Sequence, residues 1–125
     1  MGSVEEARRY LSKAQEFLEA AQVNLHLDLF NAATSNAVTS GINAKDAICL
    51  KLTGRTGKSD DHNTAVDELS RSGRDGKSVA PNLRRLLTLK QKAQYQEISV
   101  TGADAKRAVK WAELIYEKAQ NVVSR

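Results

Sequence analysis

Apolar residues recur at spacings of three and four along most of this 125-residue chain, and this period constrains the fold more than any other feature. Its first clear run is Leu11, Ala14, Leu18, Ala21 and Leu25. Such a period places apolar side chains on one face of an α-helix, whereas a half-buried strand needs a period of two. The pattern predicts an amphipathic helix over residues 4–27.

A second helix is predicted over residues 30–52, and it has two faces that can pack. One face carries small residues, and the other carries larger apolar ones. The small residues are Ala33, Ala37, Gly41 and Ala44. Small side chains let a neighbouring helix come close, and the short junction at Asp28 and Leu29 makes the first helix the expected neighbour, running antiparallel.

The remaining chain is divided by two segments rich in helix breakers, residues 53–60 and 72–78, which we expect to be loops. Between them, a short helix is expected around residues 61–71. Pro81 is expected in the first turn of a helix that runs to about residue 94, because proline is tolerated there. Thr101, with Asp104 three positions later, predicts the cap of a last helix over residues 102–123.

The composition supports an all-α fold. The chain has one proline and seven glycines, and 41% of its residues are hydrophobic, which is enough for one core. We expect a single domain spanning residues 1–125, built as a bundle of about five helices.

The chain has no run of about 20 apolar residues that could span a bilayer, and the single cysteine, Cys49, cannot close an intramolecular disulfide. We therefore expect a cytoplasmic protein without a membrane anchor.

The net charge of +4 is unevenly distributed. Residues 1–50 carry −2, residues 51–92 carry +5, and residues 93–125 carry +1. A basic middle section suits partners that bear phosphate, although many basic surfaces are simply solvated. The two histidines and Cys49 lack the short spacing of metal ligands, so we expect no metal site and no cofactor.

Several short segments, taken in order, resemble the HEPN ("higher eukaryotes and prokaryotes nucleotide-binding") domain family over nearly the whole chain. The second helix, from Asn31 to Leu50, is similar to the family's small-residue helix with its Ala-x-x-Ala-Leu-Leu-like end. Asp61 and His62 resemble the family's Ser-His before a short helix. Residues 90–95 resemble its Arg-x-x-Ala-Asp-Tyr segment. The resemblance implies a helical bundle, nucleotide or RNA binding, homodimers, and pairing with a nucleotidyltransferase in toxin–antitoxin-like systems.

The chain departs from this family where ribonuclease chemistry would reside. The ribonuclease branch has an arginine followed, usually five residues later, by a histidine, whereas this chain has Lys90 and Tyr95. Lysine is a point charge that cannot hold phosphate with a planar fork. A tyrosine hydroxyl ordinarily ionises near pH 10, which makes it a poor base at neutral pH. We therefore predict the branch that lacks the catalytic pair, and a protein that is not an enzyme.

Five residues are the candidates for ligand binding: Lys90, Arg84, Arg85, Tyr95 and His62. The first hypothesis is a non-catalytic module that binds a nucleotide, RNA or an acidic partner protein. The second is a ribonuclease toxin with an atypical site made of Lys90, Tyr95 and possibly His62. The third is a structural or adaptor bundle, in which Arg84 and Arg85 are solvated cations and Tyr95 packs its ring on the core. Residues 54–59 contain glycines, lysine and serine but are two residues shorter than a phosphate-binding loop, so we interpret them as a basic turn.

Overall fold

The structure, a computed structural model, describes residues 2–57, 61–95 and 99–125, although the side chains of Gln94 and Tyr95 lie outside the description. It is all-α, as predicted, and contains five helices with no strand among the described residues. The helices are α1 Gly2–His26, α2 Phe30–Thr53, α3 His62–Arg71, α4 Arg74–Tyr95 and α5 Gly102–Val123. None of the helices in this part of the chain is long and apolar enough to cross a membrane.

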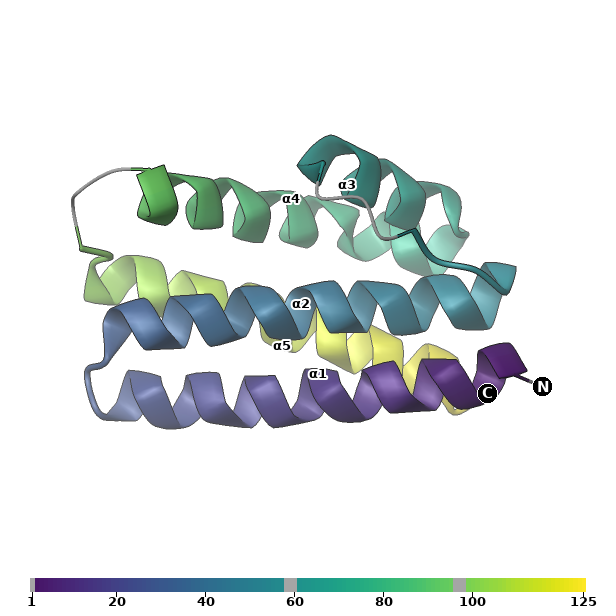
Figure 1. The fold of residues 1–125 in the computed structure, drawn as a ribbon, viewed down its shortest axis with the longest axis horizontal. Coiled ribbons are helices and arrows are strands. Elements are labelled where there is room, and N and C mark those ends of the chain that lie inside the picture. The colour runs from purple at the N-terminus through teal and green to yellow at the C-terminus, as the bar shows by residue number, and fades with distance from the viewer. Residues whose placement is uncertain (1, 58–60, 96–98) are drawn as a thin grey trace.

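The four long helices lie side by side, and α3 covers the outer side of α4 (Figure 1). The α1–α2 pair is antiparallel and closes through a tight turn in which Asp28 adopts a positive φ of 59°. The Leu29 N–H donates to the carbonyl of Asn24 at 2.8 Å across this turn. Helix α2 occupies the centre, because it packs against α1, α4 and α5.

The small residues of α2 are buried, which explains why the neighbouring helices come so close. Ala33, Ala37 and Ala44 are fully buried. A Cβ atom added to Gly41 would lie 2.6 Å from Leu86 Cδ1, so a larger residue here would displace the Leu86 side chain of α4. Other helices of the same copy cover these small residues, as the expected close packing of the first helix requires.

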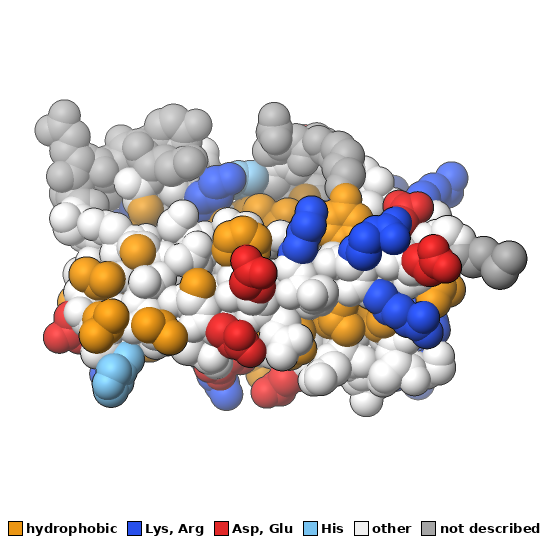
Figure 2. All heavy atoms as spheres, turned by 60° about the horizontal axis from the view of Figure 1, so that its bottom comes forward, with side chains coloured by type: hydrophobic (Ala, Val, Ile, Leu, Met, Phe, Trp, Pro, Cys, Tyr) orange, Lys and Arg blue, Asp and Glu red, His pale blue; other side chains and the backbone are white. Residues whose placement is uncertain are grey.

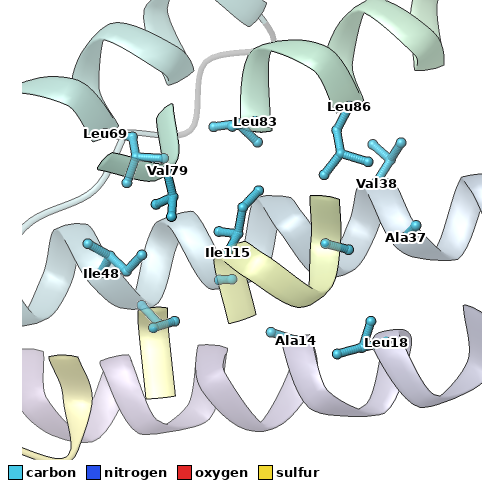
Figure 3. Close-up of a cluster of buried hydrophobic side chains, with 14 of the residues drawn as sticks. Ala14, Leu18, Ala37, Val38, Ile48, Leu69, Val79, Leu83, Leu86 and Ile115 are labelled. Atoms are coloured by element: carbon cyan, nitrogen blue, oxygen red, sulfur yellow. The ribbon is translucent and has the colours of Figure 1, made fainter. Parts of the chain in front are cut away.

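The hydrophobic core runs the length of the bundle, and Figure 3 shows side chains from all five helices meeting in it. Seven of the eight residues that the apolar period marks as most buried are buried: Leu18, Ala37, Ala44, Ile48, Leu87, Ala112 and Ile115. The eighth, Leu11, is only half-buried and packs against the core from its edge. Ser40 is also fully buried, and its hydroxyl donates to the carbonyl of Ala14 at 2.7 Å, which ties α2 to α1.

The expected loop over residues 72–78 and the expected helix start at Pro81 are both wrong. Helix α4 begins at Arg74, so Pro81 lies inside it. The turn from α3 requires only Gly73, whose φ of 146° is accessible to glycine. Asp75 then supports the first turn of α4 by accepting from Arg125 at 2.7 Å. This contact, far away in sequence, favours a helix where the local composition favours a loop.

The starts of α3 and α5 follow local chemistry. The Asp61 carboxylate accepts from the backbone N–H of Asn63 at 3.1 Å and caps α3. Thr101 caps α5 as predicted, since its hydroxyl accepts from the Asp104 N–H at 3.1 Å. Helix α3 has only ten residues, and its buried side chains are Val66 and Leu69.

Candidate ligand-binding site

A pocket of about 250 Å³ lies between α2 and α4, near the C-terminal end of α4, and contains Lys90. Most of the lining comes from one face of α2, because residues three and four apart share a face of a helix. Lys90 and Ala93 come from α4, and Val100 precedes α5. The α2 residues of the lining are Asn31, Thr34, Ser35, Val38, Thr39 and Ile42.

Thr34 has the most unusual environment in this pocket. Its side chain is 2% exposed, and its hydroxyl has no hydrogen-bond partner among the described residues. Threonine in a helix commonly donates to the carbonyl four residues earlier, as Thr39 does to Ser35 at 3.1 Å. A buried hydroxyl without a partner costs about 1–3 kcal/mol. The Thr34 hydroxyl is therefore an unused donor that lies buried beside the pocket.

The charge of the pocket favours an anion. Lys90 is half-buried, and it is the one cation in the described lining. That lining contains no aspartate or glutamate to neutralise it. Hydroxyls that can donate lie on the facing wall, and the apolar surface of Val38 and Ile42 lies beside them. The combination suits a ligand that carries both a phosphate and an uncharged, flat or apolar part.

Asn31 closes one end of the pocket. Its side-chain oxygen accepts from the backbone N–H of Val100 at 3.0 Å, which fixes the segment before α5 against the start of α2. Val100 is buried in a small apolar cluster with Ala33 and Ala105. This end of the pocket is therefore held by both a hydrogen bond and apolar packing.

The structure does not bring all the predicted site residues together. Arg84 and Arg85 are exposed and do not line the pocket. At about 100° per residue, they project from α4 roughly 120° and 140° away from Lys90, in opposite directions. Arg85 instead donates to the side chain of Asn82 at 3.4 Å.

The other two candidates are placed differently. His62 is half-buried as the first residue of α3, and it is not part of the lining. Tyr95 ends α4, but the position of its side chain lies outside the described residues. Among the five candidates, Lys90 is thus the one that the described structure places in the pocket.

A comparison with protein families supports the all-α fold. The model of the HEPN domain family matches residues 7–122, which is nearly the whole chain. The chain belongs to the HEPN domain family. A search of curated proteins found no match. In this HEPN domain, the pocket between α2 and α4 contains Lys90.

The sequence interpretation missed a second polar cluster. Lys45 and Asp46 are only 3% and 6% exposed, although both are charged and lie in the apolar part of α2. The Lys45 ammonium contacts Asp46 Oδ1 at 3.2 Å, Thr56 Oγ1 at 2.9 Å and the carboxylate of Glu68. The sequence feature that could have predicted this cluster is a pair of opposite charges between Ala44 and Ala47, in a stretch of α2 that is otherwise apolar.

Groups of three or more histidine, cysteine, aspartate or glutamate side chains that could hold a metal are absent from the described residues.

Proposed function

We propose that this HEPN domain is a non-catalytic module that binds a nucleotide or RNA in the pocket containing Lys90. One observation supports the proposal. Lys90 and Thr34, whose hydroxyl has no hydrogen-bond partner, line the same pocket, and the described lining of that pocket has no carboxylate. The ammonium would attract a phosphate, the hydroxyl would donate to a phosphate or ribose oxygen, and Val38 and Ile42 would contact the base or sugar. A volume near 250 Å³ suits a single nucleotide unit rather than a longer stretch.

The proposal excludes catalysis because the described lining lacks a group that exchanges protons at neutral pH. Cleavage of RNA needs a base near the ribose 2′-hydroxyl and a fixed cation for the charge that develops on phosphorus. Lys90 supplies a cation, but the described part of the lining contains no histidine or carboxylate. We expect purified protein to leave RNA intact. RNA degradation that disappears in a Tyr95→Phe variant would favour the atypical ribonuclease instead.

The test is a titration with AMP and with a short single-stranded RNA at two salt concentrations. Replacing Lys90 by glutamine should weaken binding and reduce the slope of log affinity against log salt by about one. Arg85→Gln is the matched control, because it removes the same charge from the same helix outside the pocket. Equal losses in the two variants would show that general charge attraction, rather than this pocket, holds the ligand.

A specific observation favours a second function, binding of a protein partner. Hydrophobic side chains gather at the end of the molecule where α1 turns into α2 (Figure 2). Val23, Leu27 and Leu29 are 57%, 59% and 50% exposed there. Exposed apolar groups that lie together commonly mark an interaction surface. This surface suits an adaptor role with a partner such as a nucleotidyltransferase, the pairing that we propose from family membership for a toxin–antitoxin-like system.

Self-association is part of the same proposal, since the family resemblance implies a homodimer. The surface involved must differ from the small residues of α2, because those are covered within one copy. Sedimentation equilibrium at micromolar concentration should give twice the mass of the chain. A monomer across ordinary salt concentrations would contradict this prediction.

A further inference from the structure

A second, larger cleft of about 540 Å³ opens on the other side of α3 from the core, and polar residues line it throughout. It lies between α3 and residues 53–57, which double back over α2 after that helix ends (Figure 1). One wall consists of Thr53, Arg55, Thr56 and Gly57, and the other consists of Thr64, Asp67, Glu68, Arg71 and Ser72. This cleft is distinct from the pocket containing Lys90.

The buried Lys45 cluster fixes the two walls to each other. Thr56 Oγ1 donates to Asp46 Oδ1 at 2.6 Å, which holds the first wall to α2. The Gly57 N–H donates to the Glu68 carboxylate at 2.9 Å, which holds that wall to α3. Lys45 lies between them and contacts both carboxylates. Removing a partner from such a buried ionic group is costly, so the walls should keep this spacing.

The backbone of Arg55 is also anchored at both sides. Thr53 Oγ1 lies 3.0 Å from the Arg55 carbonyl oxygen and 2.7 Å from the Cys49 carbonyl oxygen, so its single proton is shared between the two. Gly54 adopts a left-handed φ of 79°, and its N–H donates to the Leu50 carbonyl at 2.9 Å. The guanidinium of Arg55 nevertheless stays exposed. The exposed Arg55 side chain therefore belongs to a backbone segment that hydrogen bonds hold in place.

The two arginines of the cleft have no partner in the rest of the lining. Neither the Arg55 nor the Arg71 guanidinium has a hydrogen bond or ion pair to the part of the chain that the structure describes. Glu68 contacts Lys45, but the Lys45 ammonium also pairs with a second carboxylate, so this buried cluster carries one net negative charge. Together with Asp67, the cluster offsets the charge of the two arginines, so an anion would be held by the free guanidinium donors rather than by net charge.

The hydroxyls of the cleft contribute acceptors rather than donors. Each of them already donates to an oxygen of the protein, and the four are Thr53, Thr56, Thr64 and Ser72. The guanidiniums are consequently the main free donors. Guanidinium groups bind tetrahedral oxyanions through two parallel N–H donors, which lysine cannot do.

We propose that this cleft binds a single phosphate group, as inorganic phosphate or a phosphomonoester, between the guanidiniums of Arg55 and Arg71. The carboxylate of Asp67 limits the charge that the cleft accepts, so a polyphosphate is disfavoured. The Lys45 cluster does not contact the phosphate in this arrangement. It positions the segment that carries Arg55 opposite the helix that carries Arg71.

The experiment is a titration of the intact chain with inorganic phosphate and with pyrophosphate, followed by NMR of the arginine side-chain N–H signals. Phosphate should shift the signals of Arg55 and Arg71, and each single replacement by glutamine should weaken binding about tenfold or more. Arg74→Gln is the matched control, because Arg74 is exposed next to the α3–α4 turn and does not line the cleft. It should change the affinity less than twofold.

A second variant tests the positioning by the Lys45 cluster. Thr56→Val removes the hydrogen bond to Asp46 without changing any charge, so it should weaken phosphate binding while circular dichroism stays helical. Three results would overturn the proposal: no saturable shift with millimolar phosphate, an equal loss in Arg74→Gln, or tighter binding of pyrophosphate than of phosphate. Unchanged phosphate affinity in folded Thr56→Val protein would overturn the role of the cluster.

Discussion

Single polar residues in α2 determine much of what distinguishes this HEPN domain from a plain helical bundle. Ser40 and Thr34 are both buried hydroxyls on the same helix, but only Ser40 has a partner, the carbonyl of Ala14. Lys45 is almost as buried as Thr34, and three side chains surround its ammonium. The apolar period shows that these positions face inward, but it does not show which polar group will find a partner. That outcome depends on residues such as Ala14 and Glu68, which are more than 20 positions away.

Replacing Thr34 by valine should separate stability from binding. The change keeps the shape of the side chain and removes a buried hydroxyl without a partner, so the free energy of unfolding should rise by about 1 kcal/mol. AMP binding in the pocket should weaken at the same time. Thr39→Val is the control, because that hydroxyl is partnered by Ser35 and should give no gain in stability. Urea denaturation and AMP titration of both variants measure the two effects, and a loss of stability in Thr34→Val would contradict the prediction.

The Glu68 carboxyl should make the protein sensitive to acid. Burial acts to raise its pKa, but the hydrogen bonds from Lys45 and Gly57 outweigh burial and hold the pKa below its usual value. A lowered pKa in the folded state stabilises the protein above the ordinary carboxyl range, and this stabilisation disappears as the pH falls through the folded pKa.

The measurement is urea denaturation of wild-type protein and Glu68→Gln between pH 7 and pH 3. At pH 7 the variant should be less stable by about 1–3 kcal/mol, and the difference should shrink as the pH approaches 3. Glu117→Gln, which changes an exposed glutamate of α5, should show no comparable pH dependence. A constant difference for Glu68→Gln across this range would mean that the charge of its carboxylate is not what stabilises the fold.

At the scale of whole helices, the sequence predicts those elements whose signals are local. The apolar period and the caps at Asp61 and Thr101 are sufficient to place α1, α2, α3 and α5 within a few residues. The start of α4 could not be placed this way, because its first turn consists of glycine, serine and charged residues. That turn is helical since α3 and the C-terminal Arg125 pack against it. Pro81 is misleading for the same reason, because a proline inside a helix is tolerated when its neighbours hold the flanking turns.

Gly76→Ala tests this account of the α3–α4 corner. A Cβ atom at Gly76 would clash with the backbone carbonyl of Leu69, which cannot move without displacing α3. Although alanine is the better helix former, the clash should lower the free energy of unfolding by about 1–3 kcal/mol. Gly2→Ala is the control, since the nearest atom to its added Cβ lies at 3.9 Å. Thermal unfolding of both variants gives the comparison, and an unchanged melting temperature for Gly76→Ala would show that the corner relaxes freely.

At the scale of the whole molecule, the candidate site results from how the helices pack against one another rather than from any one segment. Helix α2 contributes to both the Lys90 pocket and the Lys45 cluster because it is the helix that contacts all the others. The family resemblance made Lys90 a candidate site residue. Helical spacing places Arg84 and Arg85 on other faces of α4 than Lys90, but the sequence could not reveal which of these faces meets α2. The second cleft also depends on tertiary structure, because its walls are joined through Lys45 of α2.

The short length of α3 has a consequence for the rate at which the protein opens. A ten-residue helix with two buried side chains, Val66 and Leu69, is the part of the bundle that loses least when it separates from the rest. Its amide hydrogens should therefore exchange with solvent deuterium through local opening, while those in the middle of α2 and α5 exchange only when the whole molecule unfolds. Mass-spectrometric hydrogen exchange resolves the two rates, and equal protection of α3 and α2 would contradict this expectation.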